Sequence, residues 1–284
     1  MSKGVLYMLG ATLLFAIMNV LVKSVAHIPA VEVVFFRSIV SFVISFGMLK
    51  AAGLKVFGSK KNRVLLILRG TSGAIALVMY FYLLQVIPLA TAVVLQFLTP
   101  VLTSLLGVFI AKEKVHPVQW LFFAMAFAGV VVVQGFDARV TPFHLLLGVL
   151  AALFAGLAYN FIRKIGKSEN SLVIILYFPL ITAPLTGGYT LFNWVEPEGW
   201  EWFTLLSIGL LTQFAQYFMT KSYQSDELSK VSSVNYTGII YGLGFGWLFF
   251  GEQFNLLTYL GMSLVLLGVI LNVWFKNSQQ KGIS

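Results

Sequence analysis

The sequence predicts an all-α integral membrane protein, with ten transmembrane helices in two inverted five-helix repeats. Of its 284 residues, 59% are hydrophobic and only 10% are charged, whereas a soluble domain carries about 25% charged residues. Apolar runs of about 20 residues recur from end to end, and a helix of that length crosses roughly 30 Å of hydrocarbon. The third observation is an internal repeat that relates the two halves of the chain.

Ten apolar runs are long enough to be membrane spans. In chain order they cover residues 4–22, 30–49, 64–86, 89–111, 117–135, 142–162, 170–192, 200–220, 229–250 and 255–275. The connections between them are short, so no soluble domain is expected outside the bilayer. The amino terminus leads into the first run without a convincing small-residue cleavage site, which indicates an uncleaved first span.

The segment from Leu89 to Val130 recurs without a gap at an offset of 139 residues. Each copy reads as an apolar helix, a polar turn centred on a glutamate, and a second apolar helix. The identical pairs are Leu89 and Leu228, Gly107 and Gly246, Glu113 and Glu252, Leu121 and Leu260, Gly129 and Gly268, and Val130 and Val269. The predicted organisation is a first repeat at residues 1–138, a second at 139–276 and a cytoplasmic tail at 277–284.

The basic residues predict the orientation of the spans. With the amino terminus inside, 15 of the 19 lysines and arginines fall in cytoplasmic segments, whereas only Lys23 and Arg139 fall in outer segments. Arg37 and Arg69 lie within spans. The positive-inside rule predicts this asymmetry for an even number of spans with both termini in the cytoplasm. The net charge of +9 therefore reports topology, and nucleic-acid binding is not expected.

Each repeat holds an odd number of spans, so the second copy must enter the membrane from the opposite side. Inverted repeats supply two related conformations for alternating access, with a site near the midplane between the halves. The lack of cysteine removes disulfides, thiolate catalysis and Cys-based metal sites. The histidines, His27, His116 and His144, all fall near span ends and are too dispersed for a metal cluster. No metal and no cofactor are expected.

Polar residues recur along one face of spans one and six. Asn19 and Lys23 are four residues apart in span one, and Asn160 and Lys164 match them in span six, next to Tyr159. One interpretation places Asn19, Tyr159 and Asn160 in a substrate cavity and makes Lys23 a gate. The alternative is that the lysines extend to opposite interfaces and the asparagines form interhelical hydrogen bonds.

Span two carries two charged residues, Glu32 near its outer end and Arg37 further in. A charge well inside lipid costs about 2.5–3.5 kcal/mol, so Arg37 should face protein, water or a carboxylate. Glu32 is five residues away and poorly placed to pair with it directly. The alternatives are a structural ion pair or interfacial anchor, and a role in gating or anion attraction.

The other midspan polar groups belong to spans three, four, eight and nine. In span four, Pro100 removes a backbone hydrogen bond at mid-membrane, and the freed carbonyl needs a protein or water partner. Uncharged amides and phenols suit recognition of a polar organic molecule better than ion storage, although helix packing is the alternative. The candidate cavity residues in these spans are Tyr80, Gln96, Thr99, Gln213, Gln216, Asn235 and Tyr236.

Spans five and ten carry almost no midspan polarity. Trp120 and Trp274 have the character of interfacial anchors. These spans are therefore expected at the periphery, where they pack against lipid or against a second protomer in a homodimer.

The outline resembles the EamA-type branch of the drug/metabolite transporter superfamily over residues 4–275. The motifs that carry this resemblance are Pro88-Leu89-Ala90, Pro100, Ala111-Lys112-Glu113, Gly129, Gly251-Glu252 and Gly268. They are specific to the fold and not to a substrate. The resemblance implies a central cavity surrounded by spans one, three, four, six, eight and nine, which two rocking bundles open to either side. The run from Glu32 to Arg37 is similar to a subset linked to S-adenosylmethionine or riboflavin uptake.

We expect a transporter that moves a small polar organic metabolite by alternating access, and not an enzyme. The alternatives are an integral membrane enzyme and a passive channel or scaffold subunit. No Asp or Glu lies at midspan, so the usual carboxylate relay for protons is missing. Facilitated exchange or diffusion is therefore expected, unless Glu32 titrates. The compact loops fit a bacterial inner membrane.

Overall fold

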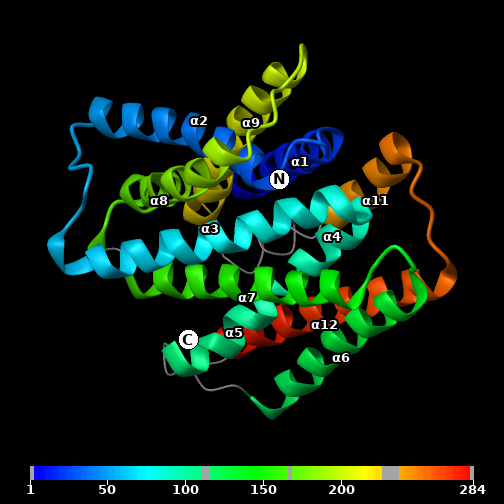
Figure 1. Cartoon of the computed structure of the whole chain (residues 1–284). Coiled ribbons are helices and arrows are strands. Elements are labelled where there is room, and N and C mark those ends of the chain that lie inside the picture. Colours follow the sequence, from blue (N-terminus) through cyan, green and yellow to red (C-terminus); the bar gives the residue numbers. More distant parts are fainter. Residues whose placement is uncertain (1–2, 111–115, 166–167, 226–236, 282–284) are drawn as a thin grey trace.

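The computed structural model describes residues 3–110, 116–165, 168–225 and 237–281. These residues form helices joined by short turns, and the described part of the chain contains no β-strand (Figure 1). A 3₁₀ turn, η1 (Lys60–Asn62), precedes α3. The helices are α1 (Lys3–Ser24), α2 (Ala30–Ala51), α3 (Arg63–Val86), α4 (Leu89–Gln96), α5 (Thr99–Ile110), α6 (Pro117–Phe136), α7 (Pro142–Ile165), α8 (Ser171–Phe192), α9 (Glu201–Ser225), α11 (Thr237–Phe250) and α12 (Leu256–Lys281).

Seven stretches of the described chain are long and apolar enough to cross a membrane. They are α1, α2, α3 with η1, α4 with α5, most of α7, α8 and most of α12. Most of α6 and the whole of α11 form shorter apolar helices, while α9 carries polar residues such as Gln213 along its 25 residues. The chain is a multi-pass membrane protein. The described helices follow the predicted spans closely, and residues 229–236 of the ninth span lie outside the described residues.

The fourth predicted span is not one helix, because α4 ends at Gln96 and α5 begins at Thr99. Pro100 has no N–H to donate to the carbonyl of Gln96, four residues earlier. The Thr99 hydroxyl donates to that carbonyl instead, at 2.7 Å, and the Thr103 hydroxyl donates to the Thr99 carbonyl at 2.7 Å. The Thr99 side chain thus satisfies a backbone carbonyl that lipid would leave without a partner.

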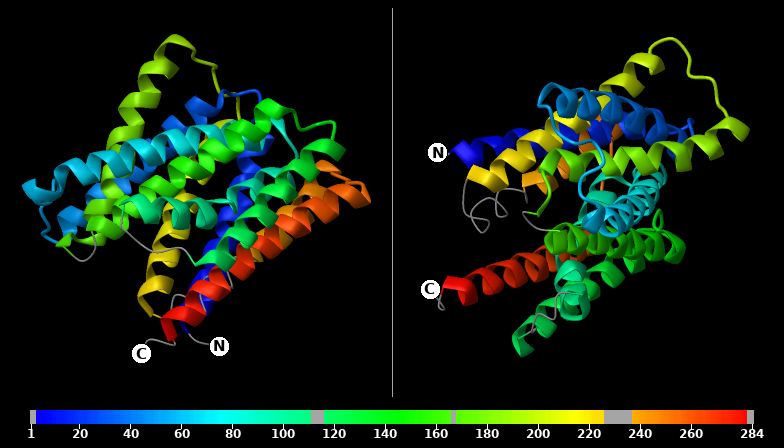
Figure 2. Two further views of the ribbon diagram at one scale, coloured as in Figure 1. Left: turned by 90° about the horizontal axis from the view of Figure 1, so that it is seen from below. Right: turned by 90° about the vertical axis from the view of Figure 1, so that its left-hand side faces the viewer.

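The principal contacts between helices stay the same when the two halves exchange places. In order along the chain, α1, α2, α3, α4 with α5, and α6 correspond to α7, α8, α9, α11 and α12. α3 packs on α7, and their counterparts α9 and α1 pack together; α2 packs on α9, and their counterparts α8 and α3 do the same. α2 meets its own counterpart α8, and α6 meets its counterpart α12 (Figures 1 and 2). Each of these principal contacts therefore joins a helix of one half to a helix of the other half.

In the contact between α6 and α12, residues that align at the offset of 139 make equivalent contacts. A Cβ atom added at Gly129 would lie 2.6 Å from the carbonyl oxygen of Gly261. A Cβ atom added at Gly268 would lie 2.6 Å from the carbonyl oxygen of Phe122. Gly129 and Gly268 are 139 residues apart, and so are Phe122 and Gly261. The aligned glycines therefore let the two helix backbones approach at two equivalent points.

Replacing Gly129 with alanine should lower the thermal stability of the detergent-solubilised protein, because the new methyl group has no room between α6 and α12. Overpacking costs about 1–3 kcal/mol, and the better helix propensity of alanine returns at most about 1 kcal/mol. The matched control is Gly244→Ala in α11, where nothing lies within 4 Å of an added Cβ. Melting curves followed by tryptophan fluorescence measure the difference. A Gly129→Ala protein as stable as the control would contradict the close crossing.

Candidate functional site

Asn19 and Asn160, which align between spans one and six, each join two helices inside the bundle. Asn19 on α1 donates from Nδ2 to the Tyr80 hydroxyl on α3, at 3.1 Å. Asn160 on α7 donates from Nδ2 to the Thr103 carbonyl on α5, at 3.0 Å. In both asparagines the amide oxygen is buried without a hydrogen-bond partner among the described residues. In each asparagine, therefore, the amide nitrogen joins two helices and the amide oxygen can still accept a hydrogen bond.

Gln96, Thr99 and Tyr159 differ in how much of their polar capacity is already used. Gln96 is half-buried at the end of α4, and no hydrogen bond joins its side chain to a described residue. Tyr159 on α7 is 44% exposed. Thr99 is buried, and its hydroxyl donates to the Gln96 carbonyl. The side chains of Gln96 and Tyr159 thus have no hydrogen-bond partner among the described residues, whereas the Thr99 hydroxyl serves the backbone.

Gln213 joins α9 to α2 and uses both ends of its amide to do so. The Ser41 hydroxyl donates to Gln213 Oε1 at 2.6 Å, and Gln213 Nε2 donates to the Ser45 hydroxyl at 3.2 Å. Gln216, nearly one turn further along α9, is half-buried. The remaining predicted cavity residues are Asn235 and Tyr236, and both lie outside the described residues.

A largely buried ion pair connects neighbouring ends of α1, α4 and α11. Lys23 Nζ lies 3.3 Å from Glu252 Oε1 and donates to the Ile87 carbonyl at 2.6 Å. Glu252 accepts the N–H groups of Leu89, at 2.7 Å, and of Ala90, at 3.4 Å. A carboxylate in this position accepts from amides that have no partner within their own helix, and the positive end of the helix dipole stabilises its charge. The cluster therefore ties the first half to the second.

Arg139 is a second cation at the same end of the bundle. Its guanidinium donates to both carboxylate oxygens of Asp137, at 2.8 Å and 2.9 Å, and to the Gln253 carbonyl at 2.9 Å. The hydrogen bonds to Asp137 raise the pKa of Arg139, so the group stays charged. Arg139 therefore links the turn between the two halves to the turn that carries Glu252.

The histidines have roles at the ends of helices. The His116 ring accepts the N–H of Val118 at the start of α6, at 3.4 Å, and His27 lies 2.9 Å from a carboxylate oxygen of Glu201 at the start of α9. The His144 ring, in the first turn of α7, accepts the N–H of Thr141, the residue before the helix, at 3.3 Å. Within the described ranges, no group of three His, Asp or Glu side chains is placed to hold a metal ion.

Glu32 and Arg37 do not pair with each other. The Glu32 carboxylate is completely buried and accepts the N–H of Val195, at 3.1 Å, so it joins α2 to the loop after α8. Arg37 donates from Nε to the Thr212 hydroxyl on α9, at 3.1 Å. The ion pairs of the described residues include neither Arg37 nor Arg69 on α3. No role was predicted for Arg69, although a charge inside an apolar run is itself a signal of function.

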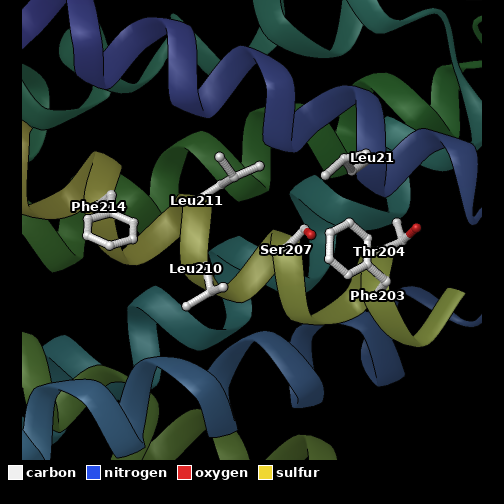
Figure 3. Close-up of a pocket in the computed structure, with 7 residues that line it drawn as sticks. All are labelled: Leu21, Phe203, Thr204, Ser207, Leu210, Leu211 and Phe214. Atoms are coloured by element: carbon white, nitrogen blue, oxygen red, sulfur yellow. The ribbon is translucent and has the colours of Figure 1, made fainter. Parts of the chain in front are cut away.

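An apolar hollow of about 340 Å³ lies between α1 and α9 (Figure 3). It is lined by Leu21, Phe203, Thr204, Ser207, Leu210, Leu211 and Phe214. None of the predicted cavity residues contributes to it, and its side chains offer only the hydroxyls of Thr204 and Ser207 as polar groups. The hollow therefore suits an apolar group and is distinct from the polar residues described above.

Comparison with known proteins defines the class. The chain is 32% identical to the pseudopaline exporter CntI of Pseudomonas aeruginosa over 274 residues, which cover 95% of each chain. It is 26% identical to human solute carrier family 35 member G1, over 97% of this chain and 81% of that one. It is also 26% identical to a riboflavin transporter of Rhizobium johnstonii, over 93% and 88% of the two chains. The protein is a membrane transporter of small metabolites.

The family follows from a second comparison. The EamA-like transporter family matches residues 2–134 and again residues 142–274. The chain belongs to this family, as its resemblance at the sequence level indicated. A crystal structure with 18% sequence identity covers 97% of this chain and 98% of its own, with a TM-score of 0.66, and this agreement shows the fold.

Removing the positive charge of Lys23 should destabilise the protein, because Glu252 would remain buried without a cation. Breaking a buried pair from one side costs about 3–5 kcal/mol. In the double variant Lys23→Met/Glu252→Gln much of the loss should be recovered, since the glutamine oxygen can still accept from Leu89. Thermal melts of the two single variants and the double variant form the cycle. Strictly additive losses would contradict a direct coupling.

Proposed function

We propose that the protein carries a small polar organic metabolite by alternating access between two inverted repeats of five transmembrane helices. The observation that carries this proposal is that the principal helix contacts stay the same when the halves exchange, down to the contacts of Gly129 and Gly268. Five spans in each half make the two copies cross the membrane in opposite senses. The halves can then exchange roles, so that the site opens first to one side and then to the other.

The cluster of Lys23 and Glu252 is the proposed outer gate. It connects helices of both halves and is buried in this conformation. Lys164, the residue of the second half that aligns with Lys23, is exposed at the end of α7. This difference supports a conformation that is closed at the outer end. Glu32 holds α2 to the loop after α8 at the same end, so it is expected to move with the gate. Glu113, the counterpart of Glu252, lies outside the described residues.

The proposed substrate contacts come from groups with unused hydrogen-bonding capacity. They are the amide of Gln96, the phenol of Tyr159 and the buried amide oxygens of Asn19 and Asn160. Tyr80, Thr99 and Gln213 position these helices through hydrogen bonds, and Gln216, Asn235 and Tyr236 complete the proposed set. Related proteins are named for pseudopaline export and riboflavin transport, which supports a metabolite with several polar groups. We propose exchange or facilitated diffusion as the mode of transport.

The proposed membrane topology places both termini in the cytoplasm of a bacterial inner membrane. α1 begins and α12 ends on the same face of the molecule (Figure 2), which supports an even number of spans. The excess of lysine and arginine assigns that face to the cytoplasm. α6 and α12 expose Trp120 and Trp274, and these surfaces would meet lipid or a second protomer.

Gln96→Leu should abolish or strongly reduce transport with normal expression, because leucine cannot replace the amide in the proposed site. A thermal-shift screen of metabolites, including riboflavin, first identifies a ligand, and counterflow of that ligand in liposomes then measures transport. The control is Gln253→Leu, whose side chain is exposed at the outer turn. Trans-stimulation distinguishes a carrier from a channel. Unchanged counterflow in Gln96→Leu would remove Gln96 from the site, and uptake without trans-stimulation would contradict alternating access.

A further inference from the structure

Arg37 and Arg69 are two guanidinium groups inside the helix bundle that no described carboxylate neutralises. The Arg37 side chain is 4% exposed. Its Nη1 atom, and the Nε and Nη1 atoms of Arg69, are buried without a hydrogen-bond partner among the described residues. Charged groups inside a membrane protein normally pair with one another or with backbone carbonyls, or they mark a substrate pathway. These donors are therefore available to a ligand.

Both guanidinium groups lie against the same aromatic ring. The Cζ atom of Arg37 is 5.3 Å from the centre of the Phe178 ring, and that of Arg69 is 4.9 Å from it. Arg37 also lies 5.7 Å from the Phe81 ring. The aromatic faces attract the cations but contribute no negative charge. The two like charges therefore repel each other across α2, α3 and α8.

Residues of three helices, Thr212, Gly73 and Tyr159, surround the pair. Thr212 on α9 holds Arg37 through its hydroxyl. A Cβ atom added at Gly73 on α3 would lie 2.8 Å from the Phe178 ring and 3.3 Å from Arg69 Nη1, so the glycine leaves room for the ring and the guanidinium. Tyr159 interacts electrostatically with Arg69 and is 44% exposed. Tyr159 is thus a partly exposed residue beside the buried pair.

We propose that Arg37 and Arg69 bind a carboxylate or phosphate group of the transported metabolite. A guanidinium donates two parallel N–H bonds to such groups, and an anion relieves the repulsion between the two arginines. Tyr159 is placed to donate a further hydrogen bond from its hydroxyl. This assignment rests on the proposed carrier function and deepens it, because it names an anionic substrate class where the amides and phenols specify only polarity.

A phosphate can come from a soluble metabolite or from a lipid headgroup, and the same guanidinium chemistry recognises both. The proposal commits to the soluble source, because the pair lies beside Tyr159, which also belongs to the proposed substrate site. The experiment therefore needs one arm with soluble anions and one with membranes of defined charge.

In the first arm, purified protein is melted with matched probes at constant ionic strength. The anionic probes are citrate, acetate, inorganic phosphate and riboflavin 5′-phosphate, and the neutral counterparts, which carry neither carboxylate nor phosphate, are acetamide and riboflavin. At least one anion is expected to raise the melting temperature where its counterpart does not. Arg37→Gln and Arg69→Gln should each weaken the apparent affinity by about tenfold or more. Arg63→Gln, exposed on α3, is the control and should leave the affinity unchanged.

Arg37→Lys is a second variant, which keeps the positive charge but cannot donate two parallel N–H bonds, so it should retain part of the affinity. It also keeps the test decisive if Arg37→Gln does not fold. Anions that stabilise no better than their neutral counterparts would overturn the proposal. An anion effect of the same size in Arg69→Gln and in the Arg63→Gln control would overturn it too.

In the second arm, the same variants are melted in liposomes of phosphatidylcholine, with or without phosphatidylglycerol. Stabilisation that depends on the arginines and on phosphatidylglycerol, without any effect of soluble anions, would assign the pair to lipid and overturn the proposal. Counterflow separates the two hypotheses. Transport of riboflavin that the arginine variants leave unchanged would sink the anion site and preserve the carrier. Arginine-dependent anion binding without counterflow of any probe would support the anion site and contradict the carrier function.

Discussion

The exclusion of water from the backbone is the constraint on which this structure depends. In hydrocarbon, each N–H, carbonyl and charge needs a partner within the protein. Glu252 accepts the first amides of α4, and Lys23 neutralises Glu252. The Thr99 hydroxyl takes the carbonyl that Pro100 cannot serve. These contacts allow a broken helix and a carboxylate-bearing turn to exist in a chain that is otherwise built from apolar helices.

The two halves meet through contacts that are the same from either side. Gly129 and Gly268 each admit the backbone of the facing helix at equivalent distances. Because the partners are equivalent, a movement that exchanges the two halves needs no new kind of contact. Polar connections are less symmetric, since Lys23 is buried in its cluster whereas Lys164 is exposed. An interface that is symmetric in its packing and asymmetric in its charges is suited to two alternating conformations.

Polar groups in the bundle have divided tasks. Gln213 is fully engaged with Ser41 and Ser45, whereas Asn19 and Asn160 each use one end of the amide and leave the other unpaired. The two arginines depart furthest from the rule that buried charges are paired. Natural proteins break such local rules mainly at functional sites, so the proposed substrate contacts were taken from the incomplete contacts, whereas the complete ones hold the helices in place.

Apolar run length, the charge asymmetry and the repeat of Leu89 to Val130 were sufficient to predict a multi-pass helical protein of the EamA type, because each acts on a span without reference to its neighbours. The structure then showed that Gly129 and Gly268, which align in the repeat, are the points where the backbones of α6 and α12 come close together. Only the tertiary structure showed that serines of α2 form hydrogen bonds with Gln213. It also showed that Arg37 and Arg69 lie against the same phenylalanine ring. Spacing along a helix shows which residues share a face, but the partner of that face depends on how helices distant in sequence pack together.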